Sequence, residues 1–261
     1  MKFDMWGIEH FLYLISPFII LGILYIILRN KSYKIRYITG VIIGIISLLI
    51  LVIRNIDIYV RNGFDPELIP LQVCHIGNIF VFISLVFRSK IATSVAWTLN
   101  LFAAYCAMIF ADSLANYDSI LCIRAQAYVW GHIFIVVGAI YAVMFKIVRI
   151  NLKSFISGVA VLFVLLIPAI ILNSYFNDVM GESINYFYMY DYKGTPLKFL
   201  YIGNRSQYGW FTINWTYSIL LFLAFVVILF LIYLTQNLFY LKDNDYKTYN
   251  IFSKKIKSNL N

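Results

Sequence analysis

Residues 11 to 28 of this chain read FLYLISPFIILGILYIIL, eighteen consecutive positions without a charged side chain. A helix needs roughly 20 apolar residues to cross the hydrocarbon core of a bilayer, so this stretch predicts a transmembrane helix. Six more stretches without Asp, Glu, Lys or Arg follow, at residues 37–53, 68–87, 91–111, 125–145, 154–174 and 210–234. The sequence therefore predicts an all-α polytopic membrane protein with seven transmembrane helices.

The composition agrees with this fold class. Hydrophobic residues make up 62% of the chain, charged residues 13%, and the mean hydropathy is +0.82, whereas soluble domains carry about 25% charged residues. Seven spans use most of the 261 residues, so residues 1–261 are interpreted as a single membrane domain with a cytoplasmic tail at 235–261. The first span is expected to be retained, because it is longer than a signal-peptide core and lacks an A-x-A cleavage site.

The basic residues gather in alternate loops and in the tail. Most of the 21 Lys and Arg residues lie after spans one, three, five and seven, accompanied there only by Asp243 and Asp245. Because cytoplasmic loops are enriched in Lys and Arg, the N-terminus is predicted outside and the C-terminus in the cytoplasm. The net charge of +9 does not indicate a nucleic-acid partner, since these residues do not share one folded face. Richness in Ile, Phe, Tyr, Asn and Lys favours a bacterial plasma membrane.

A cluster of reactive side chains opens the third span, where residues 69 to 78 read IPLQVCHIGN. At ~1.5 Å per helical residue, Cys74 is expected about 9 Å below Leu68, and His132 of the fifth span about 10 Å below Ala125. An imidazole beside a thiol can remove its proton and so create a nucleophile. The two residues therefore predict a Cys/His pair, provided that spans three and five touch. Alternatively, the cysteine is an inert small hydrophobe and the histidine an interhelical hydrogen-bond partner.

Other polar residues near this pair have several possible roles. Asn78, one turn below Cys74 on the same face, could orient the site, donate to an oxyanion or bond another helix. His75 is a rival partner for Cys74. Adjacent side chains on a helix point ~100° apart, however, so they do not easily reach the same site. Gln72 and Gln126 are expected at the membrane interface.

Three elements together carry a resemblance to a known family. They are Pro70-Leu71-Gln72-Val73-Cys74, the distant His132, and Asn185-Tyr186-Phe187-Tyr188-Met189. Over about residues 5 to 235 the chain resembles a bacterial integral membrane family (YwaF-like) that is related to eukaryotic transmembrane protein 164. The resemblance implies a cysteine-dependent acyltransferase acting on glycerophospholipids, with Cys74 as nucleophile and His132 as its partner. Its implied partners are membrane phospholipid and lysophospholipid substrates, and no metal or other cofactor is required.

In this hypothesis His132 deprotonates Cys74, the thiolate attacks a lipid ester, and the acyl group passes from the thioester to a lysophospholipid or to water. His10, Asp112 and Tyr188 are candidates for orienting the histidine or the headgroup. An alternative function is a seven-helix binding protein or transporter with an outer-leaflet pocket, in which His10, Cys74 and His132 could hold a ligand or a metal ion. A third possibility is a structural or assembly protein whose cysteine is idle.

Overall fold

The computed structural model describes residues 3–111, 114, 117, 119–193 and 195–239. Within this part, seven helical segments are long and apolar enough to cross a membrane. The segments are Ile8–Leu28, Tyr33–Asn62, Pro66–Phe87, Lys90–Ile109, Ile123–Met144, Leu152–Val179 and Trp215–Phe239. The predicted seven-helix membrane fold is thus confirmed. Most of the predicted tail lies outside the described residues.

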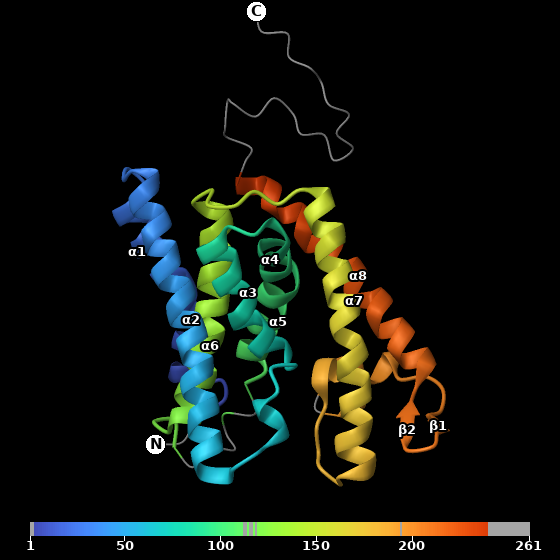
Figure 1. Cartoon of the computed structure of the whole chain (residues 1–261). Helices are drawn as coiled ribbons and strands as arrows, with labels where there is room; N and C mark the ends of the chain where they lie inside the picture. Colours follow the sequence, from blue (N-terminus) through green and yellow to red (C-terminus); the bar gives the residue numbers. More distant parts are fainter. Residues whose placement is uncertain (1–2, 112–113, 115–116, 118, 194, 240–261) are drawn as a thin grey trace, which may run out of the picture.

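The seven spans are built from eight α-helices and several short helical turns. The helices are α1 (Ile8–Leu28), α2 (Tyr33–Asn62), α3 (Val73–Phe87), α4 (Lys90–Val95), α5 (Leu101–Ile109), α6 (Ile123–Met144), α7 (Leu152–Ser174) and α8 (Trp215–Thr235). A π-helical turn, Ala96–Asn100, joins α4 to α5 within the fourth span. Two short antiparallel strands, β1 (Ser206–Tyr208) and β2 (Phe211–Ile213), form a hairpin before α8. In Figure 1, α1 to α6 form one bundle, and α7 and α8 stand together beside it.

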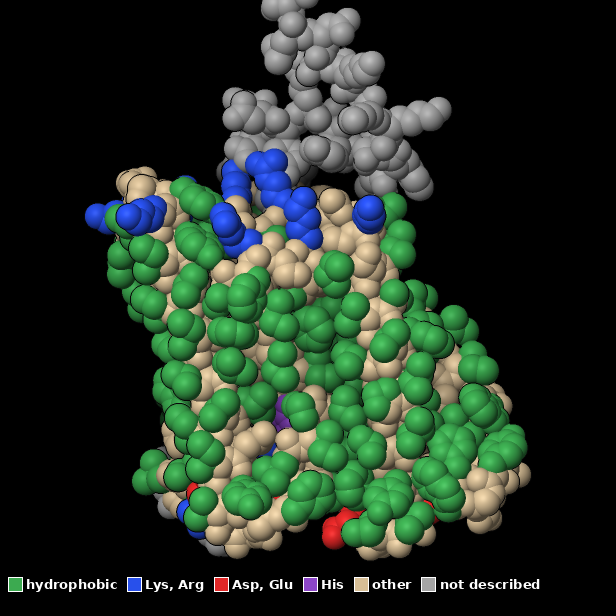
Figure 2. Space-filling view, in the orientation of Figure 1, with side chains coloured by type: hydrophobic (Ala, Val, Ile, Leu, Met, Phe, Trp, Pro, Cys, Tyr) green, Lys and Arg blue, Asp and Glu red, His purple; other side chains and the backbone are tan. Residues whose placement is uncertain are grey.

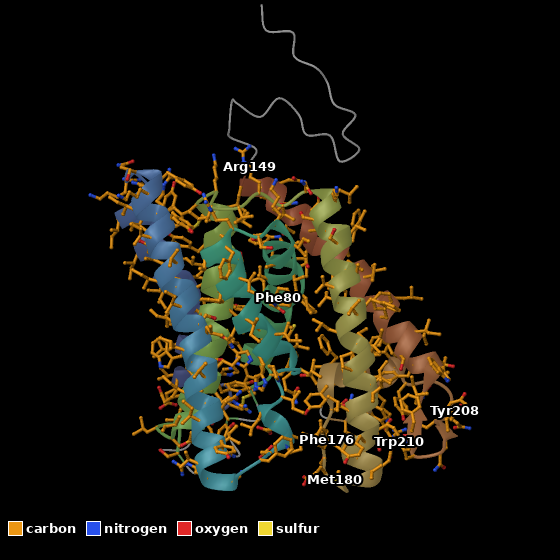
Figure 3. The ribbon with its side chains drawn as sticks, viewed as in Figure 1. Phe80, Arg149, Phe176, Met180, Tyr208 and Trp210 are labelled. Carbon is orange, nitrogen blue, oxygen red and sulfur yellow. The ribbon has the colours of Figure 1, made fainter. Side chains whose placement is uncertain are left out.

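Charged side chains separate to the two ends of this bundle. In Figure 2 a hydrophobic band lies between a top end rich in Lys and Arg side chains and a bottom end where Asp and Glu side chains appear beside a few basic ones. Figure 3 shows Arg149 at the top, and Met180, Tyr208 and Trp210 at the bottom. We call these the basic end and the acidic end. The α3 and α6 helices both run from the acidic end to the basic end (Figure 1).

The boundaries of two spans differ from those predicted. The α2 helix continues past Ile53 to Asn62, and α3 begins only at Val73. Residues before α3 form a 3-10 turn, Pro66–Leu68, whose N-cap Asp65 accepts a hydrogen bond from the Glu67 N–H at 2.8 Å. Local capping and two prolines without an N–H donor delay the helix. Pro70 therefore precedes α3. The expected 9 Å helical descent from Leu68 to Cys74 is wrong, because the residues just before Val73 are not α-helical.

Two glycines let α3 and α6 approach closely. A Cβ atom on Gly138 would lie 2.3 Å from Val81 Cγ1, and one on Gly77 would lie 2.8 Å from Ile135 Cδ1. Small residues commonly allow such close packing between membrane helices. Spans three and five are therefore in direct contact, as the Cys/His hypothesis requires.

Candidate functional site

A partly polar cavity of about 270 Å³ lies among α2, α3 and α6. Its volume is slightly below the roughly 300–1,000 Å³ typical of small-molecule pockets. The lining includes both residues of the predicted pair, Cys74 and His132, together with Asn78. The structure thus brings together three of the side chains singled out from the sequence.

The packing of α3 on α6 explains why Cys74 and His132 reach the same cavity. Cys74 precedes Gly77 by three residues, and His132 precedes Ile135 by three residues. Because the two helices run in the same direction and Gly77 meets Ile135, equal steps back along each helix reach the same height. Cys74 and His132 therefore line one cavity next to this contact. The starting point from which the depth of Cys74 was counted was wrong, because α3 begins only at Val73.

Cys74 lies in the first turn of α3, directly after Val73. The first backbone N–H groups of a helix have no partner within it. The side chain of the N-cap residue, Gln72, makes no capping hydrogen bond. Because a helix N-terminus carries partial positive charge, it stabilises a nearby anion such as a thiolate. This feature was not expected from the sequence, which predicted a position deeper within the helix.

His132 is held in an orientation suited to a base. Its Nδ1 lies 2.6 Å from the Tyr128 carbonyl oxygen, and a carbonyl can only accept, so Nδ1 carries the donated hydrogen. In a neutral imidazole the other nitrogen, Nε2, then has a free lone pair. Nε2 makes no hydrogen bond to any part of the chain that the structure describes. His132 can therefore accept a proton from a group in the cavity.

Asn78 ties two helices together beneath this pair. Its Nδ2 donates to the Cys74 carbonyl oxygen at 3.1 Å, and its Oδ1 accepts from Ser47 Oγ of α2 at 2.8 Å. These bonds fix the first turn of α3 against α2. The second hydrogen on Nδ2 is left for another acceptor.

The remaining predicted site residues lie elsewhere. His10 is fully buried, its Nε2 donates to the Met108 carbonyl at 2.8 Å, and its Nδ1 accepts from the Trp6 N–H at 3.1 Å. With both ring nitrogens engaged, His10 is not brought to the cavity. Tyr188 does not line it either, and Asp112 lies outside the described residues. Burial raises the pKa of the Tyr188 hydroxyl.

Further side chains line the cavity beside Cys74, His132 and Asn78. His75 lines it despite the predicted divergence from Cys74, because the cavity extends around the first turn of α3. Three charged residues that the sequence did not single out, Arg54, Glu67 and Arg124, line it as well, together with Gln72, Tyr117 and Tyr128. The sequence positions of the three charged residues could have pointed to the cavity, because all three directly flank apolar spans on the predicted outer side. The described residues contain no group of three His, Cys, Asp or Glu side chains placed to share a metal ion.

Seven apolar helices, with a cavity lined by cysteine and histidine side chains, define a multi-pass membrane protein. The model of the TMEM164 family matches residues 5–200. The chain therefore belongs to the TMEM164 family. The matched region contains the whole cavity and ends before the β-hairpin and α8. No curated protein and no solved structure matches the chain.

Proposed function

We propose that this protein is a membrane-embedded, cysteine-dependent acyltransferase that acts on glycerophospholipids through an acyl-cysteine thioester. The observation that carries the proposal is the shared cavity of Cys74 and His132, in which the free Nε2 of the imidazole is available as a base. Membership in the TMEM164 family supports it. We further propose a single membrane domain in a bacterial plasma membrane, with the acidic end outside and the basic end in the cytoplasm.

The first half-reaction forms the thioester. His132 Nε2 takes the proton from Cys74 Sγ, and the thiolate attacks the carbonyl carbon of a lipid ester. The bond from this carbon to the glycerol oxygen breaks, and the imidazolium returns its proton to that oxygen. A lysophospholipid leaves, and the acyl group remains on Cys74.

The second half-reaction reverses these roles with a new acceptor. His132 removes the proton from a hydroxyl of a second lysophospholipid, and the resulting oxygen nucleophile attacks the thioester. The sulfur leaves as a thiolate and recovers its proton from His132. Water as the acceptor would release a free fatty acid instead, so the same chemistry also describes a hydrolase.

Both tetrahedral intermediates need hydrogen-bond donors for their oxyanion. The backbone N–H groups of Val73, Cys74 and His75 begin α3 and have no acceptor within it, whereas that of Ile76 donates to the Gln72 carbonyl. The second N–H of Asn78 Nδ2 is a further donor in the cavity. Donors already fixed in place stabilise developing charge most effectively, typically by ~3–4 kcal/mol for one oxyanion-hole donor.

The test is covalent labelling with a clickable phospholipid in membranes that contain wild-type protein or single variants. Cys74→Ala should abolish labelling at equal expression, and His132→Ala should slow it by roughly 10²–10⁴-fold. Cys106→Ala is the matched control, because Cys106 is also a free cysteine but does not line the cavity. Undiminished labelling of Cys74→Ala would refute the proposal.

The ligand-binding alternative is supported by one observation, the presence of Arg54, Glu67 and Arg124 in the cavity lining. Charged groups in a membrane protein often mark a ligand or ion pathway. A transporter would move its ligand across vesicle membranes even in Cys74→Ala. The metal-binding form of this alternative is not favoured, since His10 is engaged away from Cys74 and His132.

A further inference from the structure

Two arginines line the cavity that contains Cys74 and His132, and they differ in how their charges are satisfied. Arg54 Nη2 lies 2.5 Å from Glu67 Oε2, and its Nη1 donates to the Glu67 carbonyl at 3.2 Å and to Asn55 Oδ1 at 3.1 Å. The charge of Arg54 is thus neutralised, and its side chain is fixed by the turn before α3.

Arg124, in the first turn of α6, has no comparable partner. Its Nε and Nη2 atoms are buried and make no hydrogen bond to any described residue. The Asp57 carboxylate lies 3.8 Å from Nε, beyond hydrogen-bond distance, and its other oxygen accepts from Arg61 at 2.7 Å. The Arg124 side chain is 28% exposed, but its Nε and Nη2 reach neither water nor an acceptor among the described residues. Leaving two charged donors unmet is costly, so this position favours an anion.

The geometry points to a phosphate-binding site: we propose that Arg124 binds the phosphate group of a glycerophospholipid whose ester reaches Cys74. The inference rests on the proposed function and names the headgroup feature that the site recognises. Arg124 precedes His132 by eight residues, or ~12 Å along α6. A glycerophospholipid carries its phosphate and its acyl esters on one glycerol unit, so one molecule presents both groups to these two places. A guanidinium presents paired donors that match phosphate oxygens.

The size of the cavity fits this assignment. A volume of about 270 Å³ accommodates the polar glycerophosphate part of a lipid, and the acyl chains remain among the apolar side chains and the bilayer. The same recognition chemistry would also accept free phosphate. Separate titrations with a phospholipid and with inorganic phosphate distinguish these two ligands.

Binding is measured in the full-length Cys74→Ala protein, which holds lipid without turnover. The probes are dihexanoyl phosphatidylglycerol, dihexanoylglycerol, which lacks phosphate, and inorganic phosphate, each titrated against the midpoint of thermal unfolding. We expect the phospholipid to stabilise the protein, and Arg124→Gln to weaken its apparent affinity by about tenfold or more, a difference of ~1.4 kcal/mol or more. Arg124→Lys should retain part of this affinity, because it keeps the charge but not the paired donors.

Arg205→Gln is a closely matched control. The Arg205 and Arg124 side chains are 27% and 28% exposed, and each lies beside an aspartate, at 3.6 and 3.8 Å. Arg205 does not line the cavity, so its replacement should leave the phospholipid affinity unchanged. Dihexanoylglycerol should bind more weakly than the phospholipid, and equally in all variants.

Each outcome decides a separate point. The phosphate site would be overturned if Arg124→Gln left the phospholipid affinity of the Cys74→Ala protein unchanged. It would also be overturned if the phospholipid and dihexanoylglycerol bound equally well. Stabilisation by inorganic phosphate alone, lost in Arg124→Gln, would support the site and assign it to a soluble phosphate compound. Arg124-dependent lipid binding without acyl labelling of wild-type Cys74 would contradict the proposed acyltransferase and leave the phosphate site standing.

Discussion

Gly77 of α3 meets Ile135 of α6 one helical turn from the level at which Cys74 and His132 line their shared cavity. The next contact along the pair is still closer, since a Cβ on Gly138 would lie 2.3 Å from Val81 Cγ1. The relative position of the sulfur and the imidazole therefore depends on two positions that have no side chain.

Gly138→Ala should force α3 and α6 apart. Overpacking of this kind typically costs roughly 1–3 kcal/mol, so thermal unfolding should begin at a lower temperature and the labelling of Cys74 should fall. Gly77→Ala should be milder, because its new methyl group meets the flexible end of Ile135. Gly22→Ala is the control, as a Cβ there meets nothing within 4 Å. Equal effects of all three substitutions would argue against the packing role.

The two cavity histidines should respond differently to replacement. His132 has a donated Nδ1 hydrogen and a free Nε2, whereas the Nδ1 of His75 is buried without a hydrogen-bond partner in the described structure. Labelling rates should therefore fall by roughly 10²–10⁴-fold in His132→Ala and much less in His75→Ala. The reverse order would make His75 the base.

Ser47→Ala removes the hydroxyl that holds Asn78 Oδ1. One such hydrogen bond is worth about 1 kcal/mol, so thermal stability should fall slightly, and labelling should slow as the first turn of α3 loosens. Asn78→Ala should slow labelling further, since it also removes the Nδ2 donor. The labelling rates of the two variants are compared after normalisation to the amount of folded protein. Identical rates would mean that Asn78 has only a packing role.

Gly131 offers a way to fill the cavity without disturbing the helices. A Cβ there would lie 3.6 Å from Asn78 Nδ2 and 3.8 Å from Ile50 Cγ2, which are ordinary contacts. Gly131→Ala should stabilise α6 by up to about 1 kcal/mol, and Gly131→Leu should occupy the cavity. Thermal unfolding and labelling are expected to diverge, with a stable Gly131→Ala protein and a poorly labelled Gly131→Leu protein. Full labelling of the leucine variant would place the substrate elsewhere.

Tyr186 should make the stability of the protein sensitive to alkaline pH. Its buried hydroxyl donates to the Pro66 carbonyl at 2.5 Å, and burial raises its pKa to about 12. In the unfolded chain the pKa is about 10, so between pH 10 and 12 the unfolded state binds fewer protons and the free energy of unfolding falls as pH rises. Tyr186→Phe should be less stable at neutral pH and show a flatter decline across this window in thermal unfolding scans.

The seven spans were predictable because each is an apolar run long enough to cross a bilayer. The residues at which the helices begin and end were less predictable. The α2 helix continues through Arg54 and Asp57, because charged residues end an uncharged run without ending a helix. The α3 helix starts late because of the prolines and the Asp65 cap. Hydropathy indicates which residues lie in the bilayer core. Capping residues and prolines decide where a helix begins and ends.

The sequence could place Cys74 and His132 toward the same end of the bundle, but neither the late start of α3 nor the lateral arrangement could be foreseen. The direction of each span follows from its number, so the shared end needs no tertiary information. Which faces of α2, α3 and α6 meet depends on packing at Gly77 and Gly138, and this packing admits Arg54 and Arg124 to the cavity. His10 shares the acidic end but binds Met108 of α5 instead.

The common direction of α3 and α6 has an electrostatic consequence. Their macrodipoles are aligned, so the partial positive charges of both N-termini face the same end of the bundle. Side-by-side dipoles of equal direction repel each other, and an anion placed between their positive poles relieves that repulsion. A thiolate or a bound phosphate would therefore strengthen the association of the very helices that create the site.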